Sequence, residues 1–423
     1  METALAIGFV GLLVFLAHLF TALFERTRIP DVLPLVVLGL LIGPGLKLIT
    51  PEAFGKVGPV FTTISLIIIL FQSGLGLHLA TLRESLLPGI RLTVLNFVGT
   101  MFVAAAIAVL MLHMSLLEGL LLGAIIGGTS SAIVIPLVGR LPVHRETRTI
   151  LLLESTFSDV LCIVTALAFI QAIRYHEVRP TLMLGQLIAS FLVAAIIGAL
   201  AACFWSATLQ RVRHLENSMF LTPAFVFVIF SIAELLGYSG AIAALAFGIV
   251  LGNIQSFSLS ALRDLLRGRA VRLTQVEEAF FSEIVFLLKT FFFVYIGLFI
   301  RVANIEPFAI GLGIVVALFL MRIPVVWGAL GKIARGLDGA LAAVMIPKGL
   351  AAAVLASLPL QAGVREGALI QDVVYAVILW SIVGTALLTF FLEKRILWRS
   401  YARFFPAEEG EGSLPENARK RRE

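Results

Sequence analysis

Residues 147 to 173 read TRTILLLESTFSDVLCIVTALAFIQAI, an apolar stretch that is long enough to cross a membrane as one helix. Two acids, Glu154 and Asp159, lie near its middle. An Asp at the centre of a membrane helix costs roughly 2.5 to 3.5 kcal/mol on insertion scales, so we expect these acids to have a function. The cost is compensated by a partner cation, a transported ion or a proton.

The composition indicates an integral membrane protein surrounded by lipids. Of the 423 residues, 60% are hydrophobic and only 14% are charged, and the mean hydropathy is +1.04. Two cysteines, Cys162 and Cys203, lie inside apolar runs and are too few for a disulfide framework.

Runs near the ~20 apolar residues that cross a bilayer predict an all-α fold with about thirteen membrane helices. The second and ninth runs are short, which leaves counts of eleven or twelve open. The expected spans cover residues 4–24, 32–46, 57–77, 89–112, 116–139, 147–173, 183–208, 218–236, 238–253, 281–300, 308–333, 339–360 and 371–392.

The distribution of Lys and Arg predicts the orientation. With the first span running inward, most of the 32 basic residues fall in loops after odd-numbered spans and in the C-terminal tail. Since basic residues gather in cytoplasmic loops, we expect the N-terminus outside and the C-terminus in the cytoplasm, in a prokaryotic-type inner or plasma membrane. The formal charge of +6 then reflects topology, and no nucleic-acid partner is expected.

Three basic residues lie inside the spans. Arg322 is near the middle of its span, which favours burial against a carboxylate. Lys289 is closer to the cytoplasmic end, where a functional role and a stem that reaches the interface are both open. Lys348 stands between Pro347 and Gly349, which together predict a break in the helix at mid-membrane.

A second break is expected in the fifth span, where residues 127–136 read GGTSSAIVIP. Two interrupted spans that are seven apart in order predict inverted repeats, with a transport site where the two broken helices cross. The plain alternative is that Gly and Pro are common in membrane helices.

Helical spacing separates the two acids, because residues four apart share a face. Asp159 shares a face with Ser155, and Glu154 shares another with Ser158. We therefore expect Glu154 to form a structural ion pair with Arg322, and Asp159 to bind an ion. In the alternative, Asp159 pairs with a Lys or Arg and both pairs are architectural.

A hard cation such as Na⁺ binds several oxygens at once, so Asp159 needs further ligands. Ser155 and Thr129 are the candidate ligands, although hydroxyls in membrane helices often bond to their own backbone.

Four segments carry a family resemblance: LLLESTFSDVLCIV, LLGAIIGGTSSAIVIPLV, AELLGYSGAIAALAFGIVLGN and LLKTFFFVYIGLFI. In that order they resemble the E-S-x-x-N-D signature, the broken helix, the A-E-x-x-G-x-S-G segment and the F-F-x-x-x-G helix of the monovalent cation/proton antiporter superfamily, which includes the sodium/proton exchangers. The similarity runs from about residue 10 to about residue 390.

The resemblance implies a homodimeric antiporter with the sodium/proton antiporter fold. In the family, the carboxylate matching Asp159 binds cation and proton in competition, and the positions matching Ser155 and Thr129 add oxygens. The acid matching Glu154 pairs with the base matching Arg322. One Na⁺, or K⁺ or Li⁺ in its place, would exchange for one H⁺ in an electroneutral cycle without a cofactor.

The family also implies a mobile core domain beside a dimer domain. Residues 1–112 would hold dimer-domain helices 1–3 and the first core helix, and 113–182 further core helices. Residues 183–208 would form a linker helix, 209–302 dimer-domain helices and 303–393 the last core helices. A partly disordered cytoplasmic tail would cover 394–423.

Three positions depart from the family pattern. Ser158 replaces the Asn of the signature, Gln72 stands where an acid is frequent, and Thr129-Ser130 replaces a Thr-Asp pair. These departures leave ion choice open. We keep Ser158 as a candidate for ion or proton binding, and Gln72, Lys289 and Lys348 as accessory candidates.

Two further classes stay open, a sodium-coupled symporter of the same fold and a channel. An enzyme is not expected, because the sequence contains no nucleophile-base constellation, metal-ligand spacing or phosphate-binding glycine loop.

Overall fold

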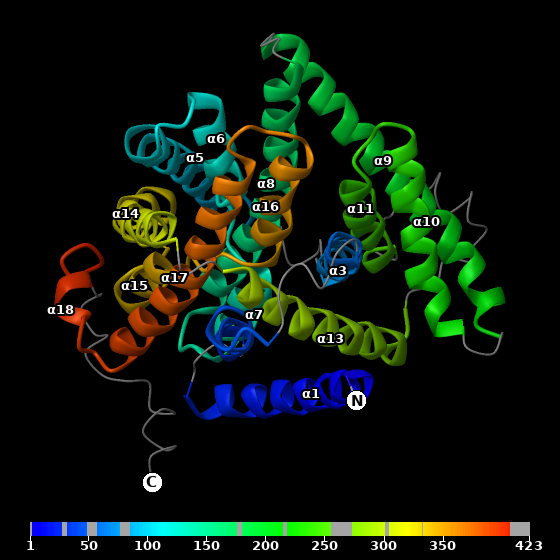
Figure 1. The fold of residues 1–423 in the computed structure, drawn as a ribbon, viewed down its shortest axis with the longest axis horizontal. Coiled ribbons are helices and arrows are strands. Elements are labelled where there is room, and N and C mark those ends of the chain that lie inside the picture. Colours follow the sequence, from blue (N-terminus) through cyan, green and yellow to red (C-terminus); the bar gives the residue numbers. More distant parts are fainter. Residues whose placement is uncertain are drawn as a thin grey trace.

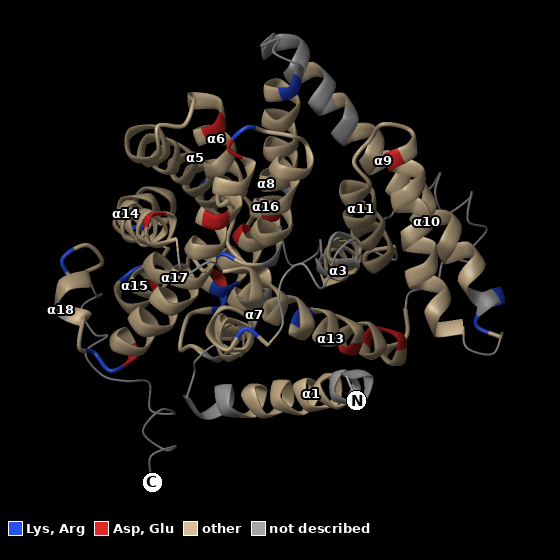
Figure 2. Ribbon diagram, viewed as in Figure 1, with Lys and Arg blue, Asp and Glu red and all other residues tan. Residues whose placement is uncertain are grey.

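A computed structural model of the protein describes residues 2–27, 32–48, 57–76, 85–175, 180–214, 218–254, 273–300, 304–331 and 333–406. Within these ranges every regular element is a helix (Figure 1). Most of the helical ribbon carries no charge, and most charged residues lie near helix ends (Figure 2).

The first half of the chain forms α1 (Glu2–Thr27), α2 (Val32–Leu40), the π-helix η1 (Leu41–Gly45), α3 (Val57–Gly76), α5 (Leu86–Leu112), α6 (Leu116–Ile125), α7 (Ser131–Arg140), α8 (Arg145–Tyr175) and α9 (Pro180–Val212). The second half forms η3 (Ser218–Phe220), α10 (Leu221–Leu235), α11 (Gly240–Gly252), α13 (Gln275–Phe299), α14 (Ile305–Leu330), α15 (Gly336–Val344), α16 (Leu350–Gln361), α17 (Gly367–Glu393) and α18 (Trp398–Tyr401).

Each expected span coincides with one of these helices or with two consecutive ones. Seven stretches in the described ranges are long and apolar enough to cross a membrane, and they involve α5, α8, α9, α10, α13, α14 and α17. The all-helical membrane architecture is therefore confirmed, whereas the count of thirteen spans stays a prediction.

The helices pack in two groups. One group contains α5, α6, α8, α14, α15, α16 and α17, and the other contains α3, α9, α10 and α11. The first group occupies the left and centre of Figure 1, and the second group occupies the right. Helix α13 packs against α2 and α3. The assignment of these groups to a mobile core domain and a dimer domain stays a prediction, and residues 407–423 of the expected tail lie outside the described residues.

Glycines allow α2 and η1 to approach α13 closely. A Cβ atom at Gly39 would lie 2.9 Å from the Cα of Gly297, and one at Gly43 would lie 3.1 Å from the Cα of Leu298. At Gly39 the nearest obstructing atoms all belong to the backbone, so they cannot move aside as a flexible side chain does. This crossing therefore depends on the missing side chains.

We expect Gly39→Ala to lower the melting temperature of the purified protein, because overpacking a close contact costs roughly 1 to 3 kcal/mol. The control is Gly313→Ala in α14, where a Cβ atom meets nothing within 4 Å. Thermal unfolding in detergent should leave the control at or above the wild-type value, since Ala favours helix. Equal melting temperatures for the two variants would contradict the packing argument.

Candidate functional site

Two helices are interrupted inside the first helix group. The first interruption separates α6, which ends at Ile125, from α7, which begins at Ser131. The second separates α15, which ends at Val344, from α16, which begins at Leu350. Both fall where glycine, proline and hydroxyl residues predict them, so the two expected breaks are confirmed.

Two hydrogen bonds join the interruptions, one between backbone groups and one from a side chain. The Ser130 N–H donates to the Pro347 carbonyl at 2.7 Å, and the Lys348 ammonium donates to the Gly128 carbonyl at 2.9 Å. The Lys348 N–H donates to Ser381 Oγ of α17, also at 2.9 Å. Since a helix break frees backbone groups that lipid cannot satisfy, these bonds explain how non-helical backbone persists at this depth.

Asp159 on α8 lies where that helix passes the first interruption. Its Oδ2 accepts a hydrogen bond from Ser131 Oγ at 3.3 Å, and the residue is buried. Ser131 is the first residue of α7, so the carboxylate is held at the N-terminus of a half-helix, where the helix dipole favours negative charge.

Further hydroxyl oxygens lie on α8 and at the first interruption. Ser158 Oγ accepts from the Thr129 N–H at 3.0 Å and donates to the Ser155 carbonyl at 3.2 Å. The Thr129 hydroxyl is buried and has no hydrogen-bond partner among the described residues. The Ser155 hydroxyl donates to the Leu152 carbonyl at 3.0 Å, which leaves its oxygen lone pairs as possible ligands.

Glu154 and Arg322 form a two-pronged ion pair. Both terminal nitrogens of the guanidinium donate to the carboxylate, with Nη2 2.6 Å from Oε2, and Nε donates to the Ala342 carbonyl at 3.2 Å. The two residues are 1% and 0% exposed. Arg322 therefore connects α14 to α8 and to the first half of the other broken helix, α15.

The three accessory candidates lie in different parts of the structure. Lys348 is 1% exposed and takes part in the crossing itself. Gln72 on α3 instead donates from Nε2 to Ser282 Oγ on α13 at 3.1 Å. Lys289 is half-buried on α13, which is neither a broken helix nor the helix that carries Asp159.

Ser131 was missed as a contact of Asp159 by reasoning from sequence. Ser131 belongs to the GGTSS segment, but which hydroxyl of that segment meets α8 depends on how the chain leaves the break. The usable signal is its position as the first residue of the half-helix that follows the break.

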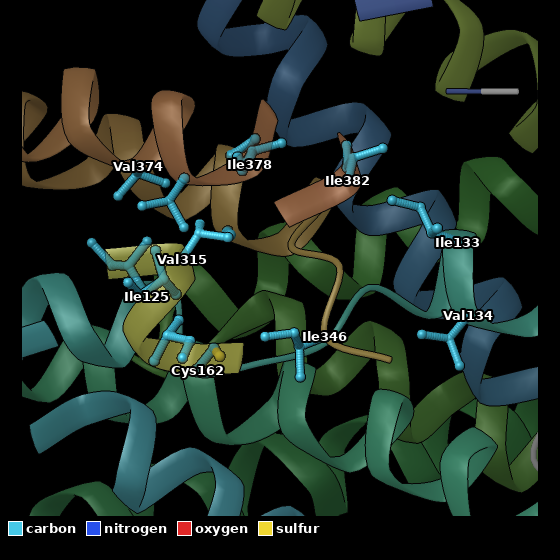
Figure 3. Close-up of a cluster of buried hydrophobic side chains, with 14 of the residues drawn as sticks. Ile125, Ile133, Val134, Cys162, Val315, Ile346, Val374, Ile378 and Ile382 are labelled. Carbon is cyan, nitrogen blue, oxygen red and sulfur yellow. The ribbon is translucent and has the colours of Figure 1, made fainter. Parts of the chain in front are cut away.

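An apolar shell surrounds the crossing. Figure 3 shows Ile346, from the second interruption, between Cys162 of α8 and Val134 of α7. Ile125 lies near Cys162 in the same view, and Ile346, Val134 and Ile125 are at most 1% exposed. Such a shell lowers the local dielectric, so charges and unpaired polar groups at the site interact strongly.

We expect Glu154→Ala to lower the free energy of unfolding by about 3 to 5 kcal/mol, because it leaves the Arg322 charge buried and unpaired. Thermal unfolding in detergent measures the loss. The double variant Glu154→Leu with Arg322→Met removes both charges and should recover much of the stability. A stable Glu154→Ala protein with strongly altered cation affinity would instead place Glu154 in the ion site.

Comparison with known proteins shows which family the sequence matches. The family model for the transmembrane sodium/hydrogen exchanger matches residues 12–394. Na(+)/H(+) antiporter 1 of Methanocaldococcus jannaschii is 26% identical over 338 residues, which cover 76% of this chain and 75% of that protein. K(+)/H(+) antiporter NhaP of Alkalimonas amylolytica is 28% identical over 200 residues, which cover 46% of this chain and 33% of that protein.

The fold also matches a solved structure. The sodium proton antiporter MjNhaP1 from Methanocaldococcus jannaschii, solved at pH 8, aligns with a TM-score of 0.73 at 23% sequence identity, over 92% of this chain and 100% of that chain. This likeness extends over nearly the whole helical assembly. Since the family match covers residues 12–394, the chain belongs to the sodium/hydrogen exchanger family.

Proposed function

We propose that this protein is a secondary transporter that exchanges a monovalent cation for a proton across the membrane, and that both bind at Asp159. The observation that carries the proposal is a contrast between the two acids of α8. Glu154 is paired with the guanidinium of Arg322, whereas the hydrogen bond to Asp159 comes from the neutral hydroxyl of Ser131. A buried carboxylate whose hydrogen-bond donor is neutral needs a cation or a proton to balance its charge.

The surrounding oxygens suit an alkali cation. Thr129 Oγ1 at the first interruption, and Ser155 Oγ and Ser158 Oγ on α8, are neutral oxygens, and hard cations select such ligands. Ser131 Oγ adds a fourth hydroxyl. A single carboxylate among neutral oxygens balances one positive charge, which supports one cation for one proton and an electroneutral cycle.

Competition at one carboxylate supplies the coupling. The ionised form of Asp159 binds the cation, and protonation removes the charge that holds it. Alternating access then exposes the site to each side in turn, through movement of the group that contains α8, α14 and the broken helices against the remaining helices. We place the N-terminus outside and the C-terminus in the cytoplasm, and family membership supports a homodimer.

Na⁺ is the proposed ion. Two relatives are named as Na(+)/H(+) antiporter 1 and probable Na(+)/H(+) antiporter 2, and the matches cover 75% and 73% of those proteins. K⁺ is the alternative, because relatives named as K(+)/H(+) antiporters match over 33% and 46% of their length.

We expect Asp159→Asn to abolish cation-dependent proton movement, because an amide cannot release a proton at the site. The assay reconstitutes the protein in liposomes with a preset proton gradient and measures dequenching of a pH dye after addition of Na⁺, K⁺ or Li⁺. The control is Asp372→Asn on α17, an acid that accepts a hydrogen bond from Asn304 and should exchange normally. Unaltered exchange in Asp159→Asn would reject the site, and an inactive wild type with every ion would reject antiport.

Competition also predicts how cation affinity depends on pH. Where the proton-bound form of Asp159 predominates, each unit of decrease in pH should raise the apparent KM for the cation about tenfold, since one proton competes with one cation. The maximal rate at saturating cation should change far less. A KM that does not vary with pH while the maximal rate does would contradict a shared site.

A further inference from the structure

The chain turns sharply where α17 ends. Arg395, the second residue after that helix, has a left-handed backbone with a φ of 60°. The Arg395 N–H donates to the Leu392 carbonyl and the Ile396 N–H donates to the Phe391 carbonyl, both at 2.9 Å. This pair of bonds closes a helix and changes the direction of the chain. Since the left-handed conformation is costly for a residue other than glycine, contacts made by the following segment have to offset that cost.

The segment that contains this turn, residues 394–406, lies against α15, and we call it the C-terminal strap. Figure 1 shows α18, which belongs to the strap, beside α15. Phe405 is 2% exposed, and its ring lies next to Gly339 in the first turn of α15. A Cβ atom at Gly339 would lie 2.8 Å from Cγ of that ring, so the missing side chain of Gly339 makes room for Phe405.

Backbone hydrogen bonds within the strap hold this ring in place. The N–H groups of Phe404 and Phe405 both donate to the Tyr401 carbonyl at 2.9 Å, and the Ala402 N–H donates to the Trp398 carbonyl at 2.8 Å. Phe404 is 52% exposed, in contrast to Phe405. The strap therefore buries one of two adjacent phenylalanine rings and leaves the other exposed.

The first turn of α15 is also held by the residue that precedes α8. Asp338 is 4% exposed and accepts a hydrogen bond from the His144 N–H at 3.0 Å, and its Oδ2 lies 3.1 Å from His144 Nδ1. Helix α8, which begins at the next residue, carries Asp159. Two neighbouring residues of α15 thus connect its first turn to the strap and to the start of the ion-site helix.

The rest of α15 leads to the crossing of the two interruptions. The Ala342 carbonyl accepts from Arg322 Nε at 3.2 Å, and the interruption that follows α15 supplies the Lys348 ammonium to the Gly128 carbonyl. Helix α15 has only nine residues. Because a short helix moves as a rigid element, a displacement of its first turn also displaces the interruption at its other end.

We propose that Phe405 is a positioning residue for the ion site, and that the C-terminal strap holds α15 in the orientation in which the two interruptions meet. The inference rests on the proposed cation/proton exchange. The strap, α17 and α15 pack together in one helix group, so their contacts persist while that group moves as a whole. Loss of the Phe405 ring therefore weakens cation binding more than it slows the movement that carries the cation.

The test compares Phe405→Ala with the wild type in liposomes, measuring the KM for Na⁺ and the maximal rate of exchange. We expect the KM to rise about two- to thirtyfold, the range for residues that act on a site through their neighbours, and the maximal rate to stay close to wild type. Phe405→Leu keeps part of the apolar contact and should give a smaller rise. The matched control is Phe404→Ala, which removes the same ring from the adjacent exposed position and should keep the wild-type KM.

Limited digestion with trypsin, followed by mass analysis, shows whether the strap is released. Arg395 is exposed and lies in the turn that the strap holds, so cleavage after it should be faster in Phe405→Ala than in the wild type or Phe404→Ala. Faster cleavage with an unchanged KM would overturn the proposal, because the strap would then be free without effect on the ion site. An unchanged cleavage rate would overturn it as well, because Phe405 would not hold the strap.

If Phe405→Ala fails to fold, Phe405→Leu is measured against the same two criteria, and a wild-type KM in that variant would count against the proposal. Absence of exchange by the wild type would reject the proposed function instead.

Discussion

The crossing of two interrupted helices is the contact on which the site depends. Two hydrogen bonds join the interruptions, one from Ser130 to Pro347 and one from Lys348 to Gly128, and the second links residues 220 positions apart. The Gly128 carbonyl belongs to the segment that follows α6, where the helix dipole leaves partial negative charge. The Lys348 ammonium compensates that partial negative charge. At the other side of the interruption, the N-terminus of α7 contacts Asp159.

Two acids five residues apart thereby acquire different roles. Glu154 contacts Arg322, a fixed positive charge, and the pair ties α8 to α14 and α15 in the interior. Asp159 faces Ser131 at the start of a half-helix, and its hydrogen-bond partner there is neutral. The helical repeat alone turns the two carboxylates to different faces. Because both are buried, their partners determine their charge balance: the guanidinium balances Glu154, whereas Asp159 needs a cation or a proton.

Reasoning from sequence predicted the features that depend on local chemistry. Pro347, Gly349 and the GGTSS segment disfavour a continuous helix, and the breaks occur there. A buried Arg needs an acid, and Glu154 is found against Arg322. Seven helices of spanning length follow from apolar runs, because the bilayer sets their minimum length.

Contacts between distant helices were beyond that reasoning. The hydrogen bond from Ser131 to Asp159 and that of Ser158 with Thr129 depend on the path of the chain through the interruption. Gln72 illustrates the reverse case, because its position in a family pattern suggests the ion site whereas its amide contacts Ser282.

The central claim is that cation and proton compete for the carboxylate of Asp159. Titration of the purified protein with Na⁺ in weakly buffered detergent solution, with a pH electrode or dye as the readout, tests it without any transport step. One proton should be released for each cation bound where the proton-bound form predominates, and Asp159→Asn should release none. Cation binding without proton release by the wild type, or equal release by the variant, would contradict it.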